Sequence, residues 1–67
     1  MKIRINGEIQ QIEGARSVAE LLEKLNVSQK GIAIELNQAV ICKEAWLFSY
    51  LKEGDALEIV QFVGGGF

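Results

Sequence analysis

Polar and apolar residues alternate over residues 2–6, at the start of the chain. This two-residue period predicts a strand with one buried face. The Asn6-Gly7 pair that ends it favours the left-handed backbone of a tight hairpin turn. The returning strand, 8–13, is less regular, because Ile9 and Ile12 lie three positions apart. We expect a bulge between these two isoleucines that brings both of them to one face.

A short amphipathic helix is predicted next, from Ser17 to Leu25. Ser17 and Glu20 have the spacing of a capping box, in which both side chains satisfy backbone N–H groups at the start of a helix. Asn26 provides a left-handed stop. The apolar residues fall on one helical stripe, made of Val18, Leu21, Leu22 and Leu25. About two turns of helix do not persist alone, so this stripe must pack on a sheet.

The pattern of residues in the second half of the chain predicts three more strands. Apolar residues at 32, 34 and 36 alternate with Ala33 and Glu35, and the turn at 37–38 leads to a short strand at 39–42. A solvated turn, Glu53-Gly54-Asp55, precedes the last strand, 56–62. Residues 43–51 are aromatic-rich and aperiodic, and predict a helical turn and connector. We expect the aromatic residues of this connector to pack in the core, namely Trp46, Phe48 and Tyr50, together with Leu51.

These elements predict an α+β roll, in which one helix covers one face of a mixed four- to five-stranded sheet. The expected core includes Ile5, Leu21, Leu22, Ile34 and Ile59. In the last strand, Val60 and Phe62 point away from the face that the helix covers. Apolar residues on an uncovered face indicate a docking patch; the alternative is that the 43–51 connector folds over them.

The amino-acid composition excludes several classes of catalytic and metal site. The 67 residues are 49% hydrophobic and allow one small domain. There is no histidine and one cysteine, Cys42, which excludes Ser-His-Asp or Cys-His catalysis, an imidazole or zinc-thiolate metal site and an internal disulfide. We expect no metal and no cofactor, and interpret Cys42 as a small buried apolar residue.

Charge and hydropathy limit the classes of partner that the protein is expected to bind. The net charge is −2 and the basic residues are scattered, which argues against nucleic acid or a membrane surface as a partner. No apolar run reaches the roughly 20 residues that span a bilayer, and none resembles a signal peptide. A cytoplasmic protein is expected.

Three glycines, Gly64-Gly65-Gly66, precede the final Phe67. A frayed end or a cloning remnant would explain them without any function. A phosphate-binding loop is disfavoured, because no helix and no lysine follow the glycines. The functional interpretation is a tail that threads a narrow enzyme channel, since glycine lets the backbone approach an active site closely.

The strand pattern, the turn Lys52-Glu53-Gly54-Asp55 and the closing stretch 60–66 together resemble the ubiquitin-like sulfur carrier proteins of the ThiS type. The resemblance implies a β-grasp domain over 1–63 and a flexible glycine tail over 64–67. It implies that an E1-like adenylating enzyme (ThiF- or MoeB-like) activates the carboxylate of Gly66, and that a sulfur donor protein then converts it to a thiocarboxylate. The carrier would be a cosubstrate and not an enzyme.

The same resemblance implies further site residues and partners. Gly64 and Gly65 would thread the partner's active site, and the sulfur would pass to a ThiG-like thiazole synthase. The residues expected to dock on the partner, from the pattern of the last strand, are Val60, Phe62 and Val63. Sulfur delivery for molybdopterin, cysteine or methionine is the alternative within this family. A protein-conjugating modifier and a β-grasp interaction module with inert glycines are alternatives outside it.

Phe67 departs from the family pattern, in which the chain ends at a diglycine. Some sulfur carriers resemble this arrangement, because they are made with a short extension that a peptidase removes. Phe67 is therefore interpreted as a processed residue, with a cloning artefact as the alternative.

Overall fold

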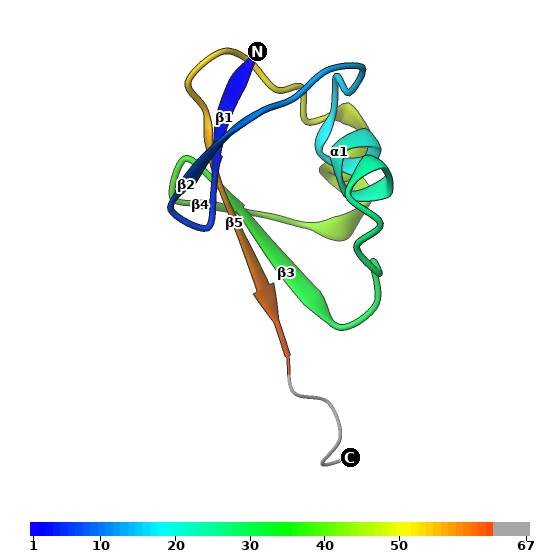
Figure 1. The fold of residues 1–67 in the computed structure, drawn as a ribbon. Coiled ribbons are helices and arrows are strands. Elements are labelled where there is room, and N and C mark those ends of the chain that lie inside the picture. Colours follow the sequence, from blue (N-terminus) through cyan, green and yellow to red (C-terminus); the bar gives the residue numbers. More distant parts are fainter. Residues whose placement is uncertain (63–67) are drawn as a thin grey trace.

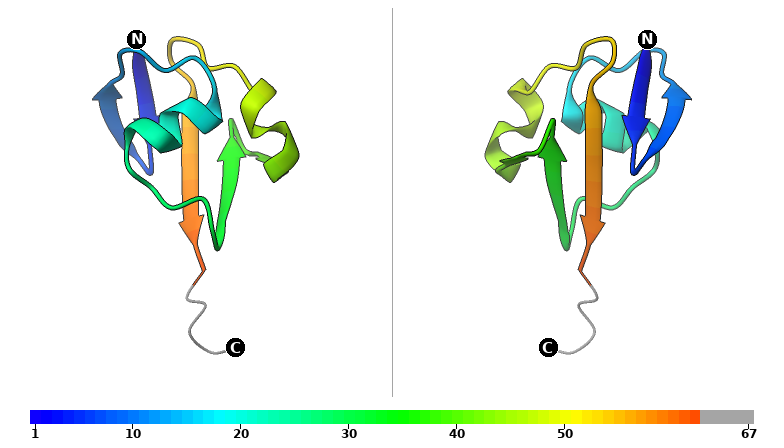
Figure 2. Two further views of the ribbon diagram at one scale, coloured as in Figure 1. Left: turned by 90° about the vertical axis from the view of Figure 1, so that its right-hand side faces the viewer. Right: turned by 90° about the vertical axis from the view of Figure 1, so that its left-hand side faces the viewer.

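The computed structural model describes residues 1–62. Its elements are β1 (Lys2–Ile5), β2 (Glu8–Gln11), α1 (Val18–Lys24), β3 (Ile32–Leu36), β4 (Ala39–Ile41), the 3-10 helix η1 (Lys43–Phe48) and β5 (Ala56–Gln61). The five strands form one mixed sheet in the order β2-β1-β5-β3-β4. Helix α1 and η1 cover one face of this sheet, and the other face is open (Figure 1, Figure 2). The predicted α+β architecture is confirmed.

The first hairpin forms at the predicted turn. Asn6 and Gly7 have φ values of 50° and 86°, in the left-handed region that such a turn requires. Strands β1 and β2 pair without a bulge, with Arg4 opposite Ile9. Ile9 is 62% exposed while Ile12 is buried. The predicted bulge is therefore wrong, because the chain keeps the regular hydrogen-bonded ladder and leaves Ile9 on the open face.

Helix α1 begins at the predicted cap. The Ser17 hydroxyl accepts a hydrogen bond from the backbone N–H of Glu20 at 3.2 Å. The Glu20 carboxylate accepts one from the backbone N–H of Arg16 at 2.7 Å, one residue before the position that a standard capping box uses. Asn26 has a φ of 60°, as the predicted stop requires.

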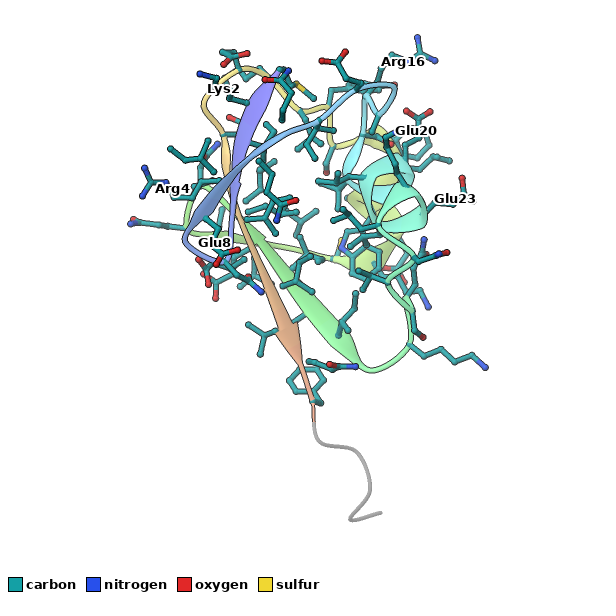
Figure 3. All side chains as sticks on the ribbon, in the orientation of Figure 1. Lys2, Arg4, Glu8, Arg16, Glu20 and Glu23 are labelled. Carbon is teal, nitrogen blue, oxygen red and sulfur yellow. The ribbon has the colours of Figure 1, made fainter. Side chains whose placement is uncertain are left out.

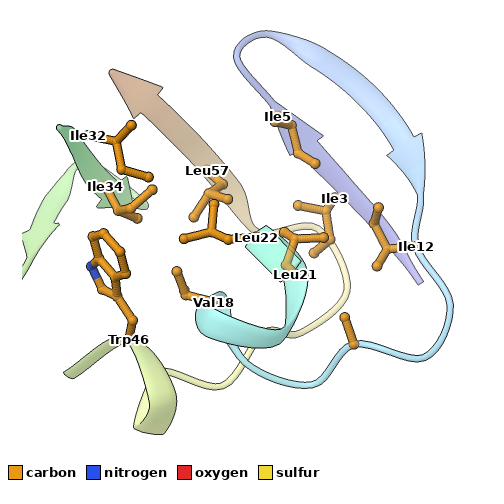
Figure 4. Packing of buried hydrophobic residues seen from close by; sticks show 11 residues of the cluster. Ile3, Ile5, Ile12, Val18, Leu21, Leu22, Ile32, Ile34, Trp46 and Leu57 are labelled. Carbon is orange, nitrogen blue, oxygen red and sulfur yellow. The ribbon is translucent and has the colours of Figure 1, made fainter. Parts of the chain in front are cut away.

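The core lies between the sheet and the two helical elements (Figure 4). Four of the five predicted core residues are buried, and Ile59 is partly buried against them. From the connector, Trp46 enters the core and donates its indole N–H to the carbonyl of Ile41 at 2.9 Å. The buried apolar residues are Ile3, Ile5, Ile12, Ala15, Val18, Leu21, Leu22, Ile32, Ile34, Trp46 and Leu57.

Other aromatic and sulfur-containing residues of this region stay outside the core. Phe48 is 67% exposed and Tyr50 68% exposed, and Cys42 is exposed as well. The predictions that these three side chains are buried are wrong. The 3-10 helix η1 is six residues long and points one of its two aromatic residues, Trp46, at the sheet, whereas Phe48 faces away. Within residues 1–62, no helix combines the length and the apolar character needed to cross a bilayer.

Candidate functional site at the end of strand β5

Strand β5 lies in the middle of the sheet, parallel to β1 and antiparallel to β3. It runs away from the end of the molecule that holds the N-terminus (Figure 1). On the β3 side the pairing continues to the last described residue, because Phe62 donates its backbone N–H to the carbonyl of Gly31 at 2.8 Å. Gly31 has a φ of 68°, which glycine adopts without strain. The residues that follow Phe62 therefore begin from a strand end that is held in place.

The Asn6 side chain holds β5 on the opposite edge. The chain turns away from β5 after Ile5, and the backbone N–H of Asn6 makes a hydrogen bond of 2.9 Å to the carbonyl of Leu57. Beyond Leu57, the side-chain amide of Asn6 pairs with the backbone of β5. Its Oδ1 accepts a hydrogen bond from the backbone N–H of Ile59 at 2.7 Å, and its Nδ2 donates one to the Ile59 carbonyl at 3.3 Å. One side chain thus replaces a strand partner. The sequence marked Asn6 only as a turn residue.

Val60 and Phe62 lie on the open face of the sheet. Val60 is 42% exposed and Phe62 58% exposed. The connector packs against α1, on the other side of the sheet. The alternative in which the connector covers these two residues is therefore wrong, and the exposure that a docking patch requires is present.

The open face also carries charge beside its apolar residues. Lys2 and Arg4 project from β1 on this side of the molecule, whereas Glu20 and Glu23 lie on the helix side (Figure 3). A shallow hollow of about 110 Å³ lies next to β1, lined by Lys2, Ile3, Arg4, Ile9 and Gly54. The face offers apolar contact near the end of β5 and carries both signs of charge, because Glu58, an exposed residue of β5, accompanies Lys2 and Arg4 of β1.

The remaining predicted site residues lie outside the described part of the chain. These residues are Val63, Gly64, Gly65, Gly66 and Phe67. Their roles stay predictions.

The turn before β5 differs from its predicted solvated form. Asp55 is buried, with 3% exposure. Its carboxylate accepts hydrogen bonds from the Asn37 amide at 3.0 Å and from the backbone N–H of Lys52 at 2.9 Å, and the Lys52 ammonium lies 3.3 Å away. Burial raises the pKa of Asp55, but these hydrogen bonds and the lysine charge outweigh burial and lower the pKa below its ordinary value. The carboxylate therefore ties the start of β5 to the β3–β4 turn.

Comparison with known proteins identifies the family. The model of the ThiS family matches residues 3–66. The crystal structure of the thiamine biosynthesis protein ThiS from Geobacter metallireducens aligns with a TM-score of 0.83 at 39% identity, covering 98% of this chain and 100% of that one. The sulfur carrier protein ThiS of Escherichia coli is 33% identical over 66 residues, which are 98% of this chain and 100% of that protein.

One relative is much longer than this chain and is named for an enzyme. A thiazole synthase of Paramagnetospirillum magneticum is 38% identical to this chain over 66 residues. The matched segment covers 98% of this chain but only 20% of that protein. The likeness to the Geobacter structure over nearly the whole chain also confirms the β-grasp fold. With a family match that extends from Ile3 to Gly66, the chain belongs to the ThiS family.

Proposed function

We propose that this chain is a sulfur carrier protein that supplies sulfur for the thiazole of thiamin. The observation that carries the proposal is the ThiS match, which runs through the glycines to Gly66. The held end of β5 and the exposed Val60 and Phe62 support it, because a carrier needs a defined starting point for its tail and a surface for its partners. The chain itself is a cosubstrate; the partner enzymes supply the catalysis.

The reaction proceeds in two steps at the carboxylate of Gly66. An E1-like, ThiF-like enzyme binds ATP, and a carboxylate oxygen attacks the α-phosphorus, which releases pyrophosphate and forms an acyl-adenylate. Sulfide released by a donor protein then attacks the acyl carbon as HS⁻. AMP leaves with the original oxygen, and the thiocarboxylate remains on Gly66. Activation is needed because a carboxylate is a poor electrophile until its oxygen becomes part of a good leaving group. Gly64 and Gly65 allow the backbone to enter a narrow channel.

We propose that Phe67, which follows Gly66, is removed before the carrier is activated. While Phe67 is attached, the carbonyl of Gly66 belongs to an unreactive amide. The carboxylate of Phe67 itself is a poor substitute, because its benzyl side chain does not fit a channel shaped for bare backbone. A peptidase that removes Phe67 would release the reactive carboxylate.

Docking uses the open face beside the tail. Val60, Phe62 and Val63 are the proposed contact residues, and two of them are exposed in the structure. Because they lie next to the start of the tail, an enzyme that binds them is within reach of Gly66. Four extended residues span roughly 13 Å beyond Phe62.

The sulfur acceptor is proposed to be a ThiG-like thiazole synthase. The support is that this chain matches one-fifth of a protein named thiazole synthase, which places a similar domain beside that activity in one polypeptide. The test is to load the chain, ending at Gly66, with sulfur-34 and to incubate it with thiazole synthase and its remaining substrates. The label should appear in the thiazole. A loaded chain that keeps its sulfur, or that delivers it only to a molybdopterin, cysteine or methionine pathway, would contradict the thiamin assignment.

A protein modifier is the second candidate, because the same tail could form an isopeptide bond with a lysine. Incubation of the chain ending at Gly66 with cell lysate and ATP separates the two functions. Conjugation would produce a ladder of larger proteins that contain the chain, whereas sulfur transfer produces none.

A further inference from the structure

We propose that Asn6 is a positioning residue, which sets the direction in which the C-terminal residues leave β5. This inference rests on the proposed function, since it concerns how the carboxylate of Gly66 reaches a partner's active site. It is carried by the two hydrogen bonds between the Asn6 side chain and the backbone of Ile59, at 2.7 Å and 3.3 Å.

The pairing of β5 explains why these two bonds matter. On its β1 edge, the strand register ends with Ile5 opposite Leu57. On its β3 edge, the register continues to Ile32 opposite Gln61. Among residues 1–62, the hydrogen bonds that hold the β1 edge of β5 at Ile59 therefore come from the Asn6 side chain. Without it, β5 would be held from the β3 side only at every residue beyond Leu57, and a strand paired on one edge twists more strongly.

A small change in strand direction has a large effect at the reacting group. Gly66 lies seven residues beyond Ile59 and four beyond Phe62. When a partner's channel holds residues 63–66 extended, they span roughly 13 Å, so a tilt of about 10° at the strand end would shift the carboxylate by about 2 Å relative to that channel. A displacement of about 1 Å from the reactive geometry can cost about 100-fold in rate. Asn6 thus acts on catalysis by a partner without contacting the reacting atoms.

Asn37 provides a matched control at the other end of the same strand. Its φ is 52°, close to the 50° of Asn6. Its Oδ1 accepts from the backbone N–H of Ala56 at 3.0 Å, as the Oδ1 of Asn6 accepts from Ile59. Both residues lie in tight turns and hold β5 through a side-chain amide, but only Asn6 is near the strand end that leads to Gly66. Removal of Asn37 should therefore destabilise the protein without redirecting the tail.

The experiment compares Asn6→Gly, Asn6→Asp and Asn37→Gly in chains that end at Gly66. Glycine keeps the left-handed backbone at both positions, and Asp at position 6 keeps the acceptor for the Ile59 N–H but loses the donor. Thiocarboxylate formation is measured with a ThiF-like adenylating enzyme, ATP and sulfide, as kcat and KM for the carrier. Thermal melts and amide hydrogen exchange at Ile59 accompany the kinetics.

Asn6→Gly should lower kcat about 10-fold, with KM changed less than about 2-fold, since a misdirected tail affects the reaction more than docking. Its Ile59 amide should exchange faster. Asn6→Asp should have an intermediate kcat, and Asn37→Gly should melt lower but retain the wild-type kcat.

Two outcomes would overturn the positioning role: a wild-type kcat in Asn6→Gly, or an equal loss of kcat in Asn37→Gly, which would mean that stability alone accounts for the rate. If the wild-type chain forms no thiocarboxylate, the proposed function fails, and this result is distinct from a failure of Asn6 alone.

Discussion

Asp55 is a buried carboxylate at the start of β5, and the fold favours its ionised form. The pKa of Asp55 is lowered in the folded protein because hydrogen bonds from Asn37 and Lys52 and the Lys52 charge outweigh burial. The stability that this lowered pKa provides is fully present above the pKa of an unfolded aspartate, about 3.9. It is lost as the pH falls further, through the lower pKa of the folded state.

Asp55→Asn should therefore lower the free energy of unfolding at pH 7 by about 1–2 kcal/mol and should flatten the loss of stability in acid. Urea unfolding between pH 7 and pH 2.5 measures both effects. Glu23→Gln is the control, because Glu23 is an exposed carboxylate on α1 and its replacement should leave the pH dependence unchanged. The same acid dependence in wild type and Asp55→Asn would contradict the assigned role of this carboxylate.

At the scale of elements, α1 depends on its contact with the sheet. Seven residues of helix do not persist alone, and the apolar stripe of α1 is buried at Val18, Leu21 and Leu22. Leu22→Ala should lower the free energy of unfolding by about 2–5 kcal/mol. A domain of this size has a total of only about 3–10 kcal/mol.

Urea unfolding of Leu22→Ala beside Glu23→Ala checks this contribution. The neighbouring exposed position should change stability by no more than about 0.5 kcal/mol. A loss below about 1 kcal/mol in Leu22→Ala would mean that α1 contributes little to the core.

The elements that could be predicted from the sequence are those with local signals. The Asn6-Gly7 turn, the Ser17 cap and the alternating strand of Ile32 and Ile34 each depend on residues close together in the chain. The sheet face on which a residue of an edge strand lies has no such local signal. The hydrophobic side chain of Ile9 suggested burial, but Ile9 lies opposite Arg4 on the open face because the hairpin ladder stays regular.

Long-range contacts explain why the sequence did not show the burial of Asp55 or the role of the Asn6 side chain. The burial of Asp55 depends on Asn37, which is 18 positions away, and the contact between Asn6 and Ile59 joins residues 53 positions apart. Short polar side chains in turns gave no sign of either contact. The exposed patch of Val60 and Phe62 was predictable, because one helix can cover only one face of a sheet. The roles of the glycines rest on family likeness, since they lie outside the described residues.

At the scale of the whole molecule, the open face should act as the docking surface. Val60→Asp and Phe62→Asp should each weaken binding to the adenylating enzyme about 10-fold or more, since a charge in the centre of an interface must be desolvated. Because both side chains are exposed, thermal melting should change little.

Leu47→Asp is the matched control for this surface. Leu47 is as exposed as Phe62, at 58% each, but it belongs to η1 on the other side of the sheet. Isothermal titration with the adenylating enzyme compares the three variants. Normal binding by both Val60→Asp and Phe62→Asp, with normal melting, would show that this face is not the interface.

The intact mass of the chain tests the central claim, that Gly66 carries the sulfur. The protein is incubated with a ThiF-like adenylating enzyme, ATP and sulfide, in a form that ends at Gly66 and in a form that ends at Phe67. The form that ends at Gly66 should gain about 16 Da, because one carboxylate oxygen is replaced by sulfur after activation and nucleophilic displacement. The form that ends at Phe67 should keep its mass until a peptidase removes the phenylalanine. No gain in the chain ending at Gly66, or an equal gain in the uncleaved chain, would contradict the account.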